Sequence, residues 1–450
     1  MLRNGIGRIR FKSREVVKHC CALVQLRAVL GTWRLVRMPW LFYQGLVRVF
    51  TVLDFGRFIL GAGNKTQRIP VSATVRNRKG LLLAIKQGFV RQKLVTYARP
   101  ESLVLFFGAT ANNEREFYFF SGEVKPLGID YSRAVNLSFA DTRQYVERQE
   151  EVTCKLLLSY LAGMFTRKLE CNSVVADVLL AYCKYFYRFF CFFLQEPKQL
   201  PRLAVVANDH SASAVAFSMV MKLFGVPRVY LQHAEVSPRF PALDFEYAIL
   251  RNHHSARIYR GIKRPRGKVY IVSRQRAQSD FEKIFRLDVG RVAIVIYLTA
   301  LFIPAQLLAV VEALRRNPNV SNVQVKFHPR TSPELQAAVA SVTLAEQTPS
   351  FDHIAIVANS SIAIELLSAG IKVFQLFALD DIGADYYGFT ARGLTPEISF
   401  SDLEQSFWQC PFYTESWKAT MADYDPTLAP SVDDLQPLIR DLVAYLVAVE

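Results

Sequence analysis

The feature that most constrains the fold is an alternation, from about residue 102 onward, of short apolar runs with segments of helical length. Continuous apolar strands between helices predict a parallel sheet covered by helices on both faces. The expected strands are residues 102–107, 203–207, 228–232, 246–250, 268–272, 292–297, 323–327, 353–358 and 372–377. The expected helices are residues 173–195, 211–224, 305–316, 333–342 and 361–369.

The strands fall into two sets, separated near residue 289, and 450 residues are too many for one core. We therefore expect an α/β fold with two Rossmann-like domains. The predicted organisation is a basic amphipathic helical segment over 1–100, one domain over 101–288, a second over 289–430, and a C-terminal helix over 431–450.

Residues 292–311 contain no charge over 20 positions, which by length alone would allow a membrane-spanning helix. The composition changes midway, from β-branched residues to a break and then to helix formers. Pro304 falls where the helix would begin, which is a favoured place for proline. The stretch therefore predicts strand, loop and helix.

The net charge of +16 is concentrated at the N-terminus, because residues 1–100 hold 20 Lys and Arg but only two acidic residues. Between residues 22 and 63 arginines interrupt bulky apolar runs, and no uncharged run reaches the ~20 residues of a spanning helix. Two interpretations remain open: a segment lying on an anionic membrane surface, or an amphipathic helix docked on the protein's own core. Nothing downstream resembles a nucleic-acid-reading module, so we expect no nucleic-acid partner.

The seven cysteines form no CxxC pair, which argues for a reducing compartment and against structural zinc. The N-terminal residues show no secretory signal, and we expect a cytoplasmic protein. No P-loop motif and no GxGxxG turn occur. The Asp423-Tyr424-Asp425 triplet has no strand before it, so we interpret it as a chance match to a metal-binding DxD. We expect neither a cofactor nor a metal.

Ligands of such sheets bind beyond the carboxyl ends of the strands, so the residues that follow each strand are the first candidates. Strand 323–327 contains Lys326 near its end and is followed by His328 and Arg330. These three side chains could bind a phosphate. The alternative is a turn histidine that caps the end of a strand.

The second candidate follows strand 353–358, where Ser360 and Ser361 open an apolar helix that carries Glu365. Serine is a preferred N-cap and needs no ligand there, but two hydroxyls and free backbone N–H groups also suit a phosphate. A carboxylate in an otherwise apolar helix needs a partner, and a ribose diol is one candidate.

The third candidate lies in the first strand set. Asp209 follows one strand, while His233 and Glu235 follow the next, and each could take a proton from an acceptor hydroxyl. The alternative for each is an ordinary polar loop residue. The adjacent His253-His254 lies in a basic segment that we interpret as a loop in contact with solvent or substrate.

With these motifs on two Rossmann-like domains, residues 200–390 resemble bacterial GT-B glycosyltransferases of capsule and lipopolysaccharide synthesis. The His328-Pro329 and Ser360-Ser361 pairs are similar to those of transferases that use CMP-linked sugars or CDP-glycerol. In such enzymes these side chains hold the donor phosphate, which implies that role for His328, Ser360 and Ser361. The family often has Gln-His-Gly where this chain has Gln232-His233-Ala234, and the acidic motif of some sialyltransferases is absent.

The resemblance implies metal-independent sugar transfer from a nucleotide-sugar donor, with CMP as the expected nucleotide. The donor would bind the second domain, and the acceptor, a lipid-linked or growing cell-surface glycan, would bind the first. The basic N-terminus fits an acceptor on the cytoplasmic leaflet of the inner membrane. Two alternatives stay open: a non-hydrolysing sugar-nucleotide epimerase, which would have Ser-Gly-Gly where this chain has Ser360-Ser361-Ile362, and a non-catalytic membrane-associated assembly factor.

Overall fold

The computed structural model describes a defined part of the chain, and all structural statements below concern that part. It comprises residues 37–49, 93–94, 104–108, 110–124, 131–133, 139–140, 173–195, 197–272, 281–286, 290–300, 302–329, 331–345, 349, 352–380, 382–409, 411–425, 428 and 434–447. Most of the basic N-terminal segment, and Arg330 among the predicted site residues, lie outside it.

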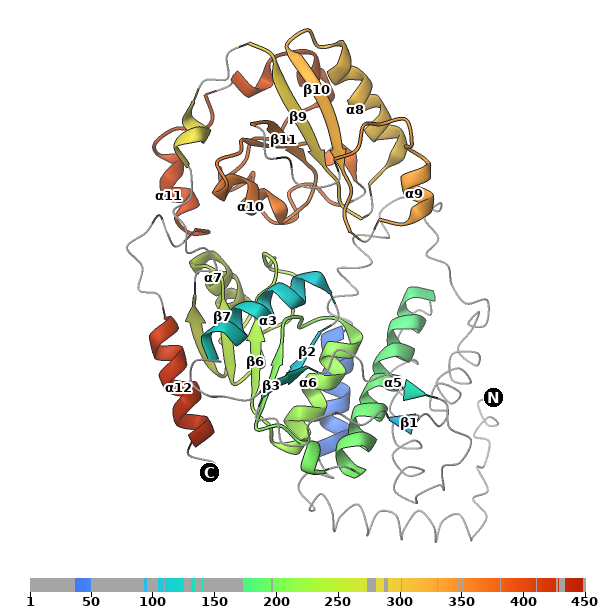
Figure 1. The fold of residues 1–450 in the computed structure, drawn as a ribbon, viewed down its shortest axis with the longest axis vertical. Coiled ribbons are helices and arrows are strands. Elements are labelled where there is room, and N and C mark those ends of the chain that lie inside the picture. The colour runs from blue at the N-terminus through green and yellow to red at the C-terminus, as the bar shows by residue number, and fades with distance from the viewer. Residues whose placement is uncertain are drawn as a thin grey trace, which may run out of the picture. The chain divides into compact units, whose positions relative to one another are not determined.

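The strands form three sheets, with the orders β3-β2-β5-β6-β7-β8, β10-β9-β11-β12 and β1-β4 (Figure 1). Their bounds are β1 Lys93–Leu94, β2 Val104–Phe107, β3 Tyr131–Arg133, β4 Phe139–Ala140, β5 Leu203–Val206, β6 Arg228–Leu231, β7 Tyr247–Leu250, β8 Lys268–Ile271, β9 Val292–Tyr297, β10 Val320–Lys326, β11 Ile354–Val357 and β12 Val373–Gln375.

The α-helices of the described chain include one over residues 37–49 and, by their labels in Figure 1, the following. They are α3 Ala111–Val124, α5 Ser173–Gln195, α6 Ala212–Phe224, α7 His253–Ile262, α8 Pro304–Arg316, α9 Pro333–Ala337, α10 Ile362–Ser368, α11 Trp417–Met421 and α12 Leu435–Val447. Chain contacts divide the molecule into one compact unit of residues 1–51, 68–231 and 445–450, and another of 52–67 and 232–444.

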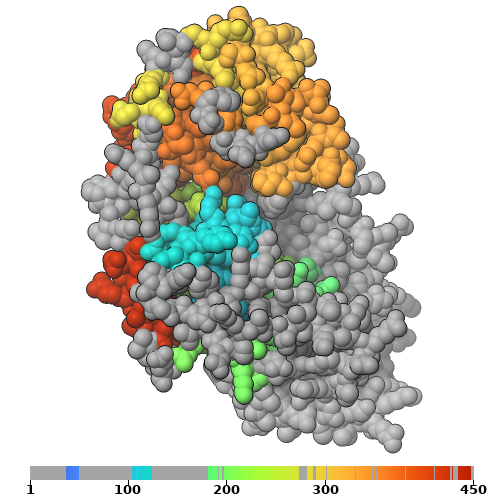
Figure 2. Space-filling view, viewed as in Figure 1, coloured from blue at the N-terminus to red at the C-terminus, as the bar shows by residue number. Residues whose placement is uncertain are grey.

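In the first unit, β2 pairs in parallel with β3 and β5, and β5 pairs in parallel with β6. Aromatic contacts hold α5 and α6 to this sheet, since the ring of Phe217 lies 4.8 Å from Phe107 and 5.4 Å from Phe189. Helix α6 begins at the N-cap Ser211 and ends at Gly225, whose φ of 79° suits glycine. Figure 2 shows α3, in cyan, at the surface.

The helix over residues 37–49 packs one face against α5. The ring of Phe42 lies 5.3 Å from Tyr182 and 5.1 Å from Phe186, and the Tyr182 hydroxyl donates to the Phe42 carbonyl at 3.1 Å. The opposite face leaves Trp40 and Tyr43 exposed at 57% and 43%. The contacts with α5 fit the interpretation of a helix docked on the protein's own core, and the membrane interpretation stays a hypothesis.

In the second unit, the sheet of β9 to β12 buries both faces. Ile294 and Ile296 belong to the core under α8, while Val295 and Tyr297 belong to the core under α10. Because side chains alternate along a strand, a strand packed on both faces must be apolar at every position. This is the reason for the uncharged run at 292–297.

The structure confirms the α/β fold with two parallel sheets. It also confirms strand, loop and helix over 292–311, with Pro304 as the first residue of α8. No helix of the described residues is long and apolar enough to cross a membrane. Helix α9 is shorter than expected, and α3 and α7 were not predicted from the sequence.

We predict that Leu314→Ala, in the core beneath α8, lowers the free energy of unfolding by about 2–5 kcal/mol, because it leaves a cavity in a packed interior. The matched control is Leu308→Ala on the same helix, where the side chain is among the exposed ones, and its effect should stay within about 0.5 kcal/mol. Urea unfolding followed by fluorescence measures both. Equal losses for the two variants would contradict the burial pattern.

Candidate functional site

The carboxyl-end edge of the second unit's sheet brings three predicted strand ends together. Lys326 on β10 and Val357 on β11 both pair in register with Tyr297 of the central strand β9. The residues that follow, His328, Thr299 and Ser360, therefore share one edge. With strands ~4.8 Å apart, the ends of β10 and β11 are separated by about 10 Å, a span that a nucleotide diphosphate or sugar phosphate can bridge.

His328 and Lys326 are both half-buried at this edge. The turn after them is closed by the Thr331 amide, which donates to the His328 carbonyl at 2.9 Å. The structure thus places a cation and an imidazole together at the end of β10.

Asn359 is a structural residue of this edge. Its side-chain amide donates to the Asp380 carboxylate at 3.1 Å, and its carbonyl oxygen accepts from the Tyr386 amide at 2.9 Å. Asp380 is buried, which raises the pKa of its carboxyl, while the Asn359 hydrogen bonds oppose that rise. These contacts hold the loop after β12 against the end of β11.

The two serines at the start of α10 do little for the helix itself. Ser361 is the N-cap, yet its hydroxyl makes no capping hydrogen bond, and Ser360 Oγ accepts from the Ile362 amide only at 3.4 Å. Because capping does not occupy the Ser361 hydroxyl, this group can serve a ligand. Helix α10 has only seven residues.

Glu365 has a partner within the protein, which was not predicted from the sequence. Its carboxylate is half-exposed and lies 3.6 Å from the Arg251 guanidinium. The premise that this carboxylate needs a ligand as its partner is therefore not required.

The most strongly perturbed carboxyl in this region is that of Glu235, which follows β6 and is buried. Asn252 Nδ2 donates to Oε1 at 2.9 Å, and Ser255 Oγ donates to Oε2 at 3.4 Å. Gln232 supports this arrangement, because its Nε2 donates to Ser255 Oγ at 2.7 Å and its Oε1 accepts from the Arg251 amide at 2.9 Å.

Burial raises the pKa of Glu235 from 4.5 to about 7, because the charged form loses its hydration. The charge of Arg251 and the two hydrogen bonds lower the pKa in part, whereas the charge of Glu365 raises it. A carboxyl that titrates near neutral pH is suited to take up and release a proton at working pH. Its place among Arg251 and Glu365 connects it electrostatically with the helix that follows Ser360 and Ser361.

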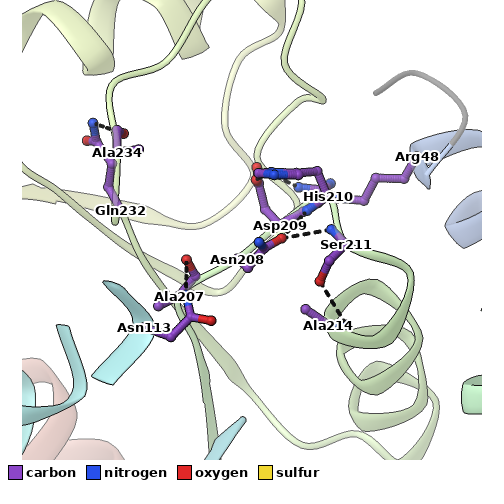
Figure 3. Close-up of polar contacts among 10 residues, drawn as sticks. All are labelled: Arg48, Asn113, Ala207, Asn208, Asp209, His210, Ser211, Ala214, Gln232 and Ala234. Carbon is purple, nitrogen blue, oxygen red and sulfur yellow. Dashed lines mark hydrogen bonds and ion pairs between the residues drawn. The ribbon is translucent and has the colours of Figure 1, made fainter. Parts of the chain in front are cut away.

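His233 lies between Gln232 and Glu235 in sequence and is half-buried. The loop that carries it is held by Gln232, whose side-chain amide also donates to the Ala234 carbonyl at 2.9 Å (Figure 3). His233 keeps its predicted catalytic role as a hypothesis, but the perturbed carboxyl beside it is the stronger candidate for the base.

Asp209 belongs to the first unit and is also buried (Figure 3). Its carboxylate lies 3.4 Å from the Arg48 guanidinium and 3.1 Å from His210 Nδ1, and Arg48 Nε donates to its carbonyl at 2.9 Å. Asn208 Oδ1 accepts from the amides of His210 and Ser211, which closes the turn into α6. Asp209 is thus held by an arginine from the basic N-terminal segment.

The loop expected at His253-His254 and the solvent contact expected for His254 were wrong, whereas contact with a substrate stays a hypothesis. These residues begin helix α7 rather than a loop, with Asn252 as the N-cap accepting from the Ser255 amide at 2.8 Å, and His254 is buried. Arg251, Asn252 and Ser255 were not predicted as site residues from the sequence. The signal was available, because they follow strand 246–250 just as His328 follows its own strand, and Asn is a preferred N-cap residue.

The described residues contain no group of three or more His, Cys, Asp or Glu side chains that could hold a metal ion. In the Asp-Tyr-Asp triplet, Asp423 pairs with Arg257, and Asp425 accepts from the Ser368 hydroxyl at 3.0 Å. The two carboxylates therefore have separate protein partners.

No protein-family model matches the sequence, and no curated protein matches it. Among solved structures, the chain is similar to S. aureus MnaA in complex with UDP, at 10% identity and a TM-score of 0.45 over 77% of this chain and 97% of the other. It is similar to the Neisseria meningitidis UDP-GlcNAc 2-epimerase bound to UDP-GlcNAc, at 14% identity and a TM-score of 0.43 over 76% of this chain and 99% of the other. It is also similar to the wall teichoic acid polymerase TagF, at 10% identity and a TM-score of 0.37 over 91% of this chain and 98% of the other.

We predict that Glu235→Gln changes how stability depends on pH. Because the folded protein binds a proton at Glu235 up to about pH 7, its stability falls as pH rises from about 4.5 to 7, by about 3 kcal/mol in total. Glu235→Gln should lack this fall. Urea unfolding at pH 5 and pH 8 measures it, with the exposed Glu312→Gln as the control. A Glu235→Gln curve parallel to that of the wild type would contradict the raised pKa.

Proposed function

We propose that the chain is a GT-B-type glycosyltransferase that moves a sugar from a nucleotide-activated donor to a glycan acceptor without a metal ion. The observation that carries this proposal is the buried Glu235 carboxyl, whose pKa of about 7 makes it a general base at neutral pH. Its hydrogen bonds from Asn252 and Ser255 fix the direction of the carboxylate oxygens.

In the proposed reaction, Glu235 accepts the proton of an acceptor hydroxyl while the hydroxyl oxygen attacks the anomeric carbon of the donor sugar. The bond from that carbon to the donor phosphate oxygen breaks, and the negative charge passes to the phosphate. Lys326, His328, Ser360 and Ser361 stabilise that charge with one cation and several hydrogen-bond donors. Arg330 and Glu365 complete the predicted donor site, and Glu365 binds the ribose diol when it leaves Arg251.

The finer assignment is a CMP-linked donor and a lipid-linked or growing cell-surface polysaccharide as the acceptor. Its support is the resemblance of His328-Pro329 and Ser360-Ser361 to the corresponding pairs of cytidine-nucleotide transferases. His233 and Asp209 are the further catalytic candidates. In this proposal Asp209 acts while its carboxylate is paired with Arg48. On this assignment, residues 101–288 bind the acceptor and residues 289–430 bind the nucleotide sugar.

We predict that CMP or CDP raises the melting temperature of the protein and that His328→Ala removes this shift. A ligand at 100 times its dissociation constant adds about 2.7 kcal/mol of stability, which a thermal-shift assay detects. UDP, GDP and TDP are measured in parallel. A shift with UDP alone would reject the cytidine assignment and return the epimerase to consideration, and no shift with any nucleotide would reject the donor site.

A substitution at Glu235 tests its proposed role as the general base. Glu235→Gln should keep the nucleotide-induced shift and lose about a hundredfold to ten-thousandfold in turnover of the nucleotide sugar, because it removes proton transfer but not donor binding. Turnover by the wild type should rise with pH through about 7, as Glu235 deprotonates. The control is Glu312→Gln, which should behave as the wild type. Full turnover by Glu235→Gln would remove Glu235 from the reaction.

We further propose that the N-terminal segment holds the enzyme on an anionic membrane surface, at the cytoplasmic face of the inner membrane. The supporting observation is the outer face of the helix over 37–49, where Trp40 and Tyr43 are exposed and their rings stack at 6.0 Å. Amphipathic aromatic rings favour the lipid interface, and each Lys or Arg of residues 1–100 that lies near anionic lipid adds about 1 kcal/mol.

We predict that the Trp40→Ala/Tyr43→Ala double variant binds vesicles of phosphatidylglycerol and phosphatidylethanolamine several-fold more weakly than the wild type, because it loses the interfacial rings. Tyr118→Ala is the matched control, since that ring on α3 is 72% exposed in the same unit. Co-sedimentation with vesicles measures both. Binding that is equal for all three proteins, or that does not fall with salt, would contradict the membrane proposal.

A further inference from the structure

The segment that forms α7 and β8 carries a concentration of positive charge that the proposed reaction does not use (Figure 1). Residues 251–268 contain seven Lys and Arg and no acidic residue. The rest of the chain after residue 100 is acidic, with 28 Lys and Arg against 37 Asp and Glu. The segment is therefore a local excess of positive charge in a part of the chain that is otherwise acidic.

Ion pairs within the protein neutralise part of this charge. Three of the seven cations pair with aspartates, as Arg257–Asp423, Arg266–Asp244 and Lys268–Asp441. By contrast, the side chains of Arg260, Lys263 and Arg264 are exposed and make no ion pair or hydrogen bond with any described residue. We call these three residues the α7 cations.

The position of the α7 cations at a helix end explains only part of the cluster. Cations are favoured near a helix C-terminus, because the last carbonyl groups there carry partial negative charge. This accounts for Arg260 in the last turn of α7, but Lys263 and Arg264 come after the helix. Three neighbouring like charges repel one another, and an anionic ligand would remove that repulsion.

The surface beside the α7 cations is open to a ligand. Gly261 is exposed, and a methyl group added at its Cα would meet no other element of the described chain within 4 Å. A ligand can therefore approach the backbone next to Arg260 closely. His253, Arg257 and Arg260 follow one another at spacings of four and three residues, which places them on the same face of α7.

This face leads from the proposed base to the α7 cations. Helix α7 begins at the N-cap Asn252, whose side-chain amide donates to Glu235 at 2.9 Å, and it ends at the C-cap Lys263. At 1.5 Å per residue, the two caps are about 16 Å apart. A ligand that touches both ends is therefore elongated, and it carries negative charge at the end far from Glu235.

The chemistry of this surface fits carboxylate or phosphate groups better than a lipid interface. Two of the α7 cations are arginines, whose guanidinium groups bind a carboxylate or a phosphate by paired hydrogen bonds. Segments that insert into lipid also expose large apolar side chains. Among the described residues, none of the exposed large apolar side chains lies on α7 or β8.

We propose that the α7 cations bind the acidic groups of an anionic glycan chain whose end lies at Glu235. This inference rests on the proposed transferase function, and it specifies the acceptor as a glycan with carboxylate or phosphate groups. Binding here makes and breaks no covalent bond. Because the attraction is between exposed charges, it should weaken as salt is added.

The test removes two positive charges at matched places of the second unit. Arg260→Gln/Arg264→Gln removes them from the α7 cations, and Arg315→Gln/Arg316→Gln removes two exposed ones from the end of α8. The probes are fluorescent oligomers of sialic acid and of glycerol phosphate, with dextran of similar length as the neutral comparison. Fluorescence anisotropy of the full chain should show that an acidic oligomer binds the first variant about tenfold more weakly than the wild type, and the second variant equally well.

A local reporter is needed as well, because the basic residues of 1–100 also attract acidic oligomers. Labelling with ¹⁵N-histidine provides it, since the chain has only seven histidines and His253 shares a helix face with Arg260. The His253 resonances are identified by their loss in His253→Gln. We expect the acidic oligomer to shift them saturably at low salt, whereas dextran should not, and the shift should need about tenfold more oligomer in Arg260→Gln/Arg264→Gln.

Three results would overturn the inference: equal affinity of Arg260→Gln/Arg264→Gln and the wild type, no shift of the His253 resonances by either acidic oligomer, or an equal shift by dextran. Phosphatidylglycerol vesicles and duplex DNA are measured in parallel. A His253 shift with one of these but with neither oligomer would make the surface one for lipid or nucleic acid and would reject the glycan.

Nucleotide binding, measured by thermal shift on the same samples, separates this inference from the proposed function. A protein that binds a nucleotide but no acidic oligomer at His253 loses this inference and keeps the transferase. A protein that binds no nucleotide loses the proposed function itself, and with it the role of the glycan as an acceptor.

Discussion

The parallel pairing of β9 with β10 and β11 is the constraint on which the proposed donor site depends. Backbone hydrogen bonds set the register that aligns Lys326, Tyr297 and Val357, and a shift of one residue would send each side chain to the opposite face. The register is fixed because both faces are buried in packed cores. His328 and Ser360 are therefore held about two strand spacings apart, although 32 residues separate them in sequence.

The balance of charge around Glu235 illustrates how a fold can prepare a base. Desolvation alone would hold the carboxyl protonated, and a close arginine alone would hold it ionised. Here Arg251 is shared, since it also lies 3.6 Å from Glu365 and its attraction is divided between two carboxylates. The charges of Arg251 and Glu365 therefore act on the pKa of Glu235 in opposite directions.

The sequence predicted the fold well, because strands such as 292–297 must be apolar at every position when both faces are covered. It also placed Glu235, His328 and Ser360 after the carboxyl ends of strands. That prediction depends only on the order of strands and helices along the chain. It could not predict the Arg251–Glu365 ion pair, whose partners lie 114 residues apart. Nor could it reveal that His254 is buried, because two histidines between arginines are typical of an exposed segment.

His254 and Tyr424 are held in the second unit in a different way from the buried polar groups around Glu235. Gln232, Asn252 and Ser255 satisfy one another and Glu235, so they gain in the folded protein itself. The side chains of His254 and Tyr424 make no such hydrogen bonds within the described chain, and what holds them is packing, because the two rings stack and Tyr424 also contacts Phe389.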